Sequence, residues 1–145
     1  MKKHLLSMLV LLAVSSTLLF GCKKEDMPKL TDTTFTLTVK EYVNEMTNTG
    51  YFTSSGDPTT AGNYTMDVHV AGDSLHCSQT LTVPAVGTIT IISDCSVTTN
   101  TGAWYITEGT GAYANLRGNG SLIMSFPTEN NPSDIEALYG KTWRE

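Results

Sequence analysis

Apolar and polar residues alternate along most of the chain after residue 33, with the period of two that is typical of strands with one buried face. Gly, Asn, Asp and Pro separate the alternating runs. The clearest runs are 35–39, 64–70, 75–83, 89–91, 104–106 and 122–126. Short strands with frequent turns predict an all-β fold, either a sandwich or a barrel.

Turn signals between these runs predict the connections. The segment 71–73, Ala-Gly-Asp, is short enough for a tight hairpin. The dipeptide at 119–120, Asn-Gly, is favoured in two-residue turns because both positions tolerate a positive φ. The tetrapeptide Thr-Asn-Thr-Gly occurs at 47–50 and again at 99–102, and we expect a loop at each.

The C-terminal segment has a different pattern. Residues 131–134, Asn-Pro-Ser-Asp, can cap a short helix that continues through Tyr139, with Gly140 as its stop signal. We expect this short C-terminal helix to pack on the β domain or to cover one of its ends.

The N-terminus has the pattern of a secretory signal peptide. Lys2 and Lys3 form a positive region, residues 5–20 are mostly apolar, and the small residue Gly21 follows. The alternative, a transmembrane anchor, needs about 20 apolar residues in a row, whereas this run is shorter and ends at Cys22. We therefore expect residues 1–21 to be removed on export.

The segment 19–22, Leu-Phe-Gly-Cys, resembles the lipobox of bacterial lipoproteins. The resemblance implies that Cys22 carries a diacylglycerol and an acylated amino group, and several acyl chains anchor a protein stably to a membrane. The charged residues 23–26 are similar to the stretch after the lipid cysteine in Bacteroidetes lipoproteins, where it can direct export to the cell surface. A solvated tether is the alternative. The resemblance implies a lipid-anchored protein of the cell envelope, at the outer membrane and either periplasmic or surface-exposed, with residues 22–33 as its tether.

Composition limits the remaining domain and its partners. Without residues 1–21 the chain has 124 residues, enough for one domain with its own core, which we place at 34–145. Residues 22–145 contain all 14 Asp and Glu but only seven of the nine Lys and Arg, so the net charge of this segment is −7. No basic cluster follows Lys24, which argues against nucleic acid as a partner. The oligomeric state is left open.

Two cysteines, Cys77 and Cys95, remain once Cys22 is assigned to the lipid. An exported domain lies in an oxidising compartment, which favours a disulfide between them. Such a bond would contribute about 3 kcal/mol by the chain-entropy argument. The alternatives are a reactive thiol or a metal pair, for which His76 is the only additional ligand nearby.

The segment 104–118, WYITEGTGAYANLRG, resembles the Gly-Thr-Gly-aromatic…Arg-Gly segment of the allene oxide cyclase and dirigent-like barrels. The resemblance implies a small antiparallel β-barrel of about eight strands, calycin-like in architecture. A barrel mouth lined by Glu108, Tyr113 and Arg117 is the functional interpretation. A glycine-marked strand bend with a salt bridge between Arg117 and Glu108 is the structural one.

Gln79 lies at an odd-numbered position of the run 75–83, on the same predicted inward face as Leu75, Cys77, Leu81 and Val83. A buried amide needs hydrogen-bond partners, so Gln79 belongs either to a pocket or to a satisfied polar core. Candidate partners are Tyr64, Glu108 or a ligand.

His69 and His76 fall on the outer parity of two strands joined by the turn at Gly72, so we expect them near each other on the surface. With Asp67 or Asp73 they could begin a metal site, but a third ligand with firm spacing is missing. We predict no metal site and no cofactor, and no residue pattern indicates a catalytic triad or paired catalytic carboxylates.

Two short segments resemble the Asp-Ser/Thr acceptor motif for O-glycosylation in Bacteroidetes, Asp32-Thr33-Thr34 and Asp73-Ser74-Leu75. The resemblance implies sugar on Thr33 and Ser74.

Three functions follow as hypotheses. The first is a non-enzymatic envelope lipoprotein whose barrel binds a small apolar ligand or a protein partner. The second is a cyclase-like or dirigent-like activity inside the barrel, and the third is a purely structural surface lipoprotein. A catalyst needs titratable groups within reach of its substrate, whereas a binder needs only an open, largely apolar pocket.

Overall fold

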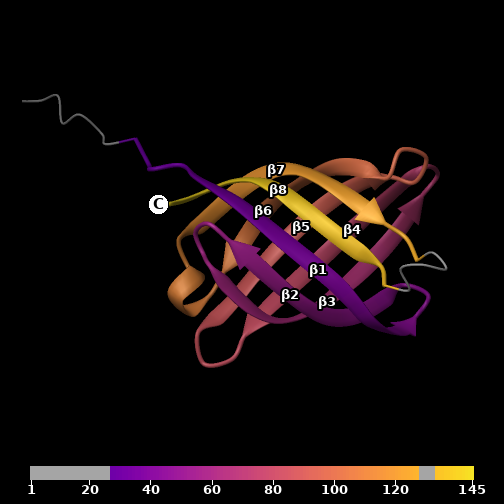
Figure 1. Ribbon diagram of the computed structural model, residues 1–145, viewed down its shortest axis with the longest axis horizontal. Helices are drawn as coiled ribbons and strands as arrows, with labels where there is room; N and C mark the ends of the chain where they lie inside the picture. Colours follow the sequence, from indigo (N-terminus) through magenta and orange to yellow (C-terminus); the bar gives the residue numbers. More distant parts are fainter. Residues whose placement is uncertain (1–26, 128–132) are drawn as a thin grey trace, which may run out of the picture.

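Eight antiparallel strands close into a barrel in the computed structural model, which describes residues 27–127 and 133–145 (Figure 1). The expected all-β barrel is therefore confirmed. Consecutive strands pair throughout, and the last strand closes the ring on the first. The elements are β1 (Thr31–Asn44), β2 (Thr47–Ser55), β3 (Thr60–Ala71), β4 (Ser74–Val83), β5 (Gly87–Ser96), β6 (Thr101–Gly109), the 3₁₀ turn η1 (Gly111–Tyr113), β7 (Leu116–Ser125) and β8 (Ile135–Arg144).

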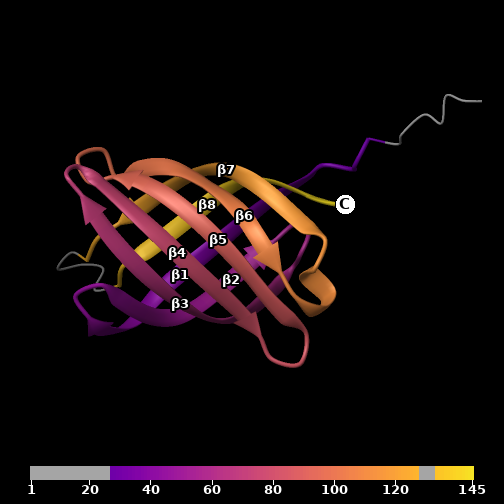
Figure 2. The same ribbon diagram turned by 180° about the vertical axis from the view of Figure 1, so that it is seen from behind.

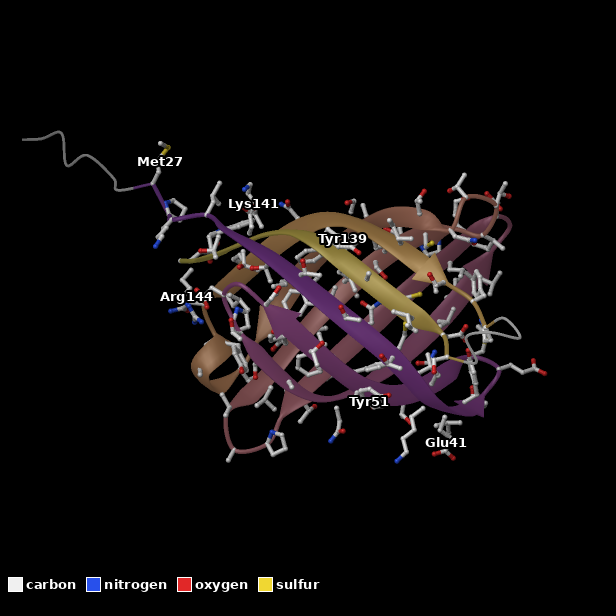
Figure 3. The ribbon with its side chains drawn as sticks, viewed as in Figure 1. Met27, Glu41, Tyr51, Tyr139, Lys141 and Arg144 are labelled. Atoms are coloured by element: carbon white, nitrogen blue, oxygen red, sulfur yellow. The ribbon has the colours of Figure 1, made fainter. Side chains whose placement is uncertain are left out.

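Alternation of side chains along each strand separates the core from the surface. Inward positions hold an aromatic centre in which Phe35 and Trp104 meet edge to face, with ring centroids 5.7 Å apart. Outward positions such as Tyr51, Tyr139 and Lys141 point into solvent (Figure 3). The buried apolar core consists of Phe35, Leu37, Phe52, Tyr64, Met66, Cys77, Leu81, Ile89, Ile91, Cys95, Trp104, Ile106, Tyr113, Leu116, Leu122 and Leu138.

The barrel has two distinct ends. Residues 27–30 enter at the end that we call proximal, where β8 also finishes and η1 lies (Figures 1 and 2). The opposite end, which we call distal, carries the β1–β2, β3–β4 and β5–β6 connections, the end of β7 and the start of β8. Within the described residues, all eight strands and the whole apolar core lie between Thr31 and Arg144, and these strands close the ring by themselves.

The expected C-terminal helix is wrong. Ile135–Arg144 forms β8, which pairs with β1 on one side and with β7 on the other. Without β8, both neighbouring strands would expose a row of unpaired backbone groups. Closure of the ring therefore overrides the local capping signals at 131–134, of which residues 131–132 lie outside the described residues.

Turn predictions had mixed outcomes. The hairpin at 71–73 is confirmed, with Gly72 at a φ of +62°. The Asn-Gly pair at 119–120 lies inside β7 and residues 47–50 lie inside β2, so both of those predictions are wrong. Gly120 is opposite Trp104 on β6 and Gly140 on β8. Close packing of strands, and not a turn, explains this glycine.

The N-terminal predictions fall mostly on residues 1–26, outside the described part of the chain. The signal peptide at 1–21, Cys22 and the beginning of the tether therefore stay predictions. The strand β1 begins at Thr31, three residues before the boundary expected at residue 34. Among the described residues, no helix is long and apolar enough to cross a membrane.

Candidate functional site

A cavity of about 210 Å³ opens at the distal end of the barrel. Its walls are mainly apolar, and its rim includes side chains that are exposed, such as Tyr42, Met46, Val70 and Phe126. We call it the distal cavity. Its lining residues are Val39, Tyr42, Asn44, Glu45, Met46, Thr47, Asn48, Met66, Val68, Val70, Leu75, Met124, Ser125, Phe126, Asp134, Ile135 and Glu136.

Three polar side chains form a buried cluster at the inner side of this cavity. Gln79 on β4 donates from Nε2 to both carboxylate oxygens of Glu136 on β8, at 3.0 and 3.1 Å. The same Nε2 lies 2.8 Å from the Oγ of Ser93 on β5, and that hydroxyl donates to Glu136 at 3.2 Å. We call these residues the interior cluster. In the ring of eight strands β8 lies opposite β4, so the Glu136–Gln79 contact joins opposite walls of the barrel.

The strand pattern places these groups. Glu136, Gln79 and Ser93 each occupy an inward position and are almost fully buried. Glu136 is two residues before Leu138, which pairs with Phe35 in the aromatic centre. The interior cluster therefore lies between the packed aromatic centre and the distal cavity, and Glu136 contributes to the lining of that cavity.

Burial raises the pKa of the Glu136 carboxyl from 4.5 to about 7. Loss of hydration disfavours the charged form, and the hydrogen bonds from Ser93 and Gln79 offset only part of that cost. The pKa of Tyr64 is also raised, first by its own burial and then by the negative charge of Glu136. This carboxyl can therefore gain or lose a proton near neutral pH.

Several buried polar oxygens in the barrel have no hydrogen-bond partner among the described residues. They are the Oδ1 of Asn48, the Oδ1 of Asp134, the Oε1 of Gln79 and the hydroxyl of Tyr64. Asn48 is itself only 5% exposed. Buried polar atoms without a partner are uncommon and call for an explanation, and Asn48 and Asp134 both line the distal cavity.

The four residues predicted from the sequence as pocket candidates, Gln79, Glu108, Tyr113 and Arg117, lie outside the distal cavity. Gln79 points inward and is buried, as expected, but its partners are Ser93 and Glu136. Tyr113 is buried at the proximal end, where its hydroxyl lies 3.4 Å from the Oγ1 of Thr60.

The expected salt bridge between Arg117 and Glu108 is also wrong. Arg117 pairs with Glu145 at 2.9 Å, and Glu108 is exposed on β6. The chain turns through η1 between these two strands, and Gly111 adopts a φ of +57° there. The Gly-Thr-Gly segment therefore makes a connection at the proximal end, and the open cavity is at the other end.

The predicted disulfide is wrong, since Cys77 and Cys95 are both free, buried thiols. Cys77 lies opposite Ser93 and Cys95 lies opposite Leu75, so the two cysteines are diagonal neighbours on β4 and β5. Residues that are diagonal neighbours on paired strands lie roughly 7 Å apart, with a somewhat shorter distance between their Cβ atoms. The Cβ atoms of a disulfide must approach to about 3.8 Å. Burial raises the pKa of Cys77 to about 12, with a further contribution from Glu136, which disfavours a reactive thiolate.

The histidine prediction is confirmed in its geometry. His69 and His76 lie directly opposite each other on the outer face of β3 and β4, with stacked rings whose centroids are 6.4 Å apart. The Nδ1 of His76 contacts a carboxylate oxygen of Asp94. In the part of the chain that the structure describes, no three His, Cys, Asp or Glu side chains are grouped to hold a metal ion.

The two glycosylation predictions fare differently. The Oγ1 of Thr33 is buried against the Oγ1 of Thr142 at 2.6 Å, so a sugar on Thr33 does not fit the folded barrel. Ser74 begins β4 at the distal end and is only half-buried, so its modification stays a prediction.

Sequence reasoning missed Ser93 and Glu136. Ser93 shares the inward parity of Ile89 and Ile91, and that run could have been extended to it. In β8 the inward positions are Glu136, Leu138, Gly140 and Thr142, while Tyr139 and Trp143 fall on the outward parity. The period of two is therefore present in β8, but several inward positions are polar or small and the large aromatic residues face outward. A search for strands with an apolar inner face therefore does not find β8.

No protein-family profile, curated protein or solved structure matches this chain.

Proposed function

We propose that this protein is a non-enzymatic binding module of the cell envelope, and that it takes a small, largely apolar ligand into the distal cavity. The observation that carries the proposal is the cavity itself, a pocket of about 210 Å³ with mainly apolar walls. An apolar cavity of about 150 Å³ binds benzene. A ligand somewhat larger than benzene therefore suits this one.

The rim supports the same proposal. Tyr42, Val70 and Phe126 are between 43% and 60% exposed, and all three line the distal cavity. Exposed apolar side chains around a pocket are typical of a site that buries a ligand. The proximal half of the barrel, by contrast, is packed with buried side chains such as Leu81, Ile89 and Leu116.

We further propose that the domain is anchored through a lipid on Cys22 and faces the periplasm or the cell surface. Eight residues lie between Cys22 and Thr31, the first residue of β1, so the two are at most about 30 Å apart. Because residues 27–30 join the barrel at the proximal end (Figure 1), a lipid on this tether would leave the distal cavity turned away from the membrane.

Binding can be tested with the neutral probe 2-phenylethanol and residues 23–145, followed by backbone amide shifts in NMR. We expect saturable shifts around the distal cavity. Val68→Phe, which places a larger side chain in the wall of the cavity, should abolish the saturable shifts. Val83→Phe changes a valine that is also partly buried against the core but lies at the proximal end, and it should leave them intact. Absence of saturable shifts would favour the purely structural alternative.

The anchor has its own test. Cys22→Ser in cells fed a radiolabelled fatty acid should abolish labelling of the protein, and labelling that persists would contradict the lipid proposal.

The interior cluster favours a second candidate function, a cyclase-like activity on an apolar substrate. A carboxyl with a pKa of about 7 at the edge of an apolar cavity suits general acid or base catalysis near neutral pH. The proton-abstraction probe 5-nitrobenzisoxazole opens to a coloured phenolate when a base removes its ring C–H proton. We would compare the chain with Glu136→Gln and with Glu108→Gln. Equal rates for all three would exclude Glu136 as the base.

A further inference from the structure

Three residues that line the distal cavity carry acceptor oxygens with few or no hydrogen-bond donors around them. Asn48 presents an unpartnered Oδ1, Asp134 presents an unpartnered Oδ1, and Glu136 presents its carboxylate. Among the described residues, no donor reaches the Oδ1 of Asn48 or the Oδ1 of Asp134. The carboxylate of Glu136 accepts only from Gln79 and Ser93. A ligand that completes this site must therefore bring hydrogen-bond donors.

The charges around the cavity have one sign. Glu45, Asp134 and Glu136 line it, and no Lys, Arg or His is present among its described lining residues. A buried carboxylate without a cation is costly, and an ion of opposite charge that binds beside it recovers part of that cost.

Groups from the other walls do not supply the missing charge. Tyr64 on β3, Cys77 on β4 and Cys95 on β5 face Glu136, and the negative charge of Glu136 raises the pKa of each. These groups are neutral near pH 7 because their pKa values lie above their ordinary ones. Among the described residues, therefore, no positive charge lies beside Glu136 in the cavity.

We infer that the ligand of the distal cavity carries a protonated amine on an apolar body, with the ammonium group donating hydrogen bonds to Glu136 and Asn48. This inference rests on the proposed binding function. It selects against ligands with a carboxylate or phosphate, because their negative charge would meet the buried Glu136 and, at the rim, Asp134 and the exposed Glu45.

Three probes with the same phenyl group test the inference. They are 2-phenylethylamine, which is cationic, 2-phenylethanol, which is neutral, and phenylacetate, which is anionic. We would titrate each into residues 23–145 at pH 8 and follow amide shifts in NMR. The amine should bind at least tenfold more tightly than the alcohol, and phenylacetate should bind more weakly than both.

The pH profile gives a second readout. Ionised Glu136 attracts the amine and protonated Glu136 does not, so the affinity for the amine should fall about tenfold from pH 8 to pH 6, while the probe itself stays protonated. The alcohol should show no such fall. Glu136→Gln should remove both the preference for the amine and its pH dependence, and the exposed Glu108→Gln should preserve them.

The outcomes separate the two proposals. If the alcohol binds in the cavity and the amine binds no better, the amine inference is overturned and the binding function stands. An amine preference that survives in Glu136→Gln, or that does not change with pH, also overturns the inference. If no probe binds saturably, both proposals fail. The pH profile of the unmutated chain keeps the test valid even if Glu136→Gln does not fold.

Discussion

Glu136→Gln is expected to stabilise the barrel at pH 8 much more than at pH 5. Glu136 is 4% exposed, and its pKa is about 7 in the folded chain against 4.5 for an ordinary glutamate. In the folded state the carboxyl therefore holds its proton at pH values where the unfolded chain has already released it. Folding is favoured by this group at low pH, and stability is lost as the pH rises from about 4.5 through about 7.

The magnitude follows from the two pKa values. Each pKa unit corresponds to about 1.36 kcal/mol, so ionised Glu136 costs the folded state about 3 kcal/mol above pH 7. The Glu136→Gln variant would avoid this cost, because a neutral amide still accepts from Gln79. The new amide group can also donate to the Oε1 of Gln79, which has no partner among the described residues.

Urea unfolding of residues 23–145 at pH 5, 6, 7 and 8 measures the effect. The free energy of unfolding of Glu136→Gln should exceed that of the unmutated chain by an amount that grows by about 2 to 3 kcal/mol from pH 5 to pH 8. Because both chains contain the same cysteines and tyrosines, the titration of those groups cancels in the difference. Glu108→Gln, which removes an exposed carboxylate, should run parallel to the unmutated chain. If Glu136→Gln also runs parallel, Glu136 is not held in a poorly solvated site and the interior cluster is misassigned.

Three further predictions concern the core. Denatured, non-reduced protein should take up two equivalents of iodoacetamide at Cys77 and Cys95, counted by mass spectrometry, whereas uptake only after reduction would show a disulfide. Gly140→Ala should lower the free energy of unfolding by about 1 to 3 kcal/mol, because the new Cβ would collide with the backbone carbonyl of Asn119 and lie 2.7 Å from Cζ2 of Trp104; an unchanged urea midpoint would refute this close packing. Gln79→Leu should destabilise the barrel more at pH 8 than at pH 5, since the ionised carboxylate of the interior cluster loses one of its two side-chain donors, and a loss independent of pH would contradict that role.

Strands could be predicted from the sequence wherever one of their faces is apolar. Runs such as 64–70 and 75–83 fall in β3 and β4, and the turn at Gly72 between them is confirmed. Gln79 was recognised as inward from its parity alone. In each case a period of two, together with burial of every second side chain, makes the local sequence sufficient to predict both the strand and its inner face.

The register between neighbouring strands could not be predicted from the alternation of apolar residues. Cys77 and Cys95 have the right compartment and spacing for a disulfide, yet their diagonal placement on β4 and β5 keeps them apart. A strand pair can slide by two residues without changing which side chains point inward. The alternation of apolar residues therefore does not decide which cysteine lies opposite which residue.

The sequence by itself determined the all-β class, the inner faces of most strands and the inward position of Gln79. Tertiary structure alone decided that Ile135–Arg144 is the closing strand, and so placed Glu136 opposite Gln79 and beside the distal cavity. The physical reason is ring closure. An edge strand must pair its backbone, and β8 satisfies β1 and β7 even though its inner face is polar. A carboxylate that would be a solvated helix residue by local signals thus becomes the buried acid of the candidate site.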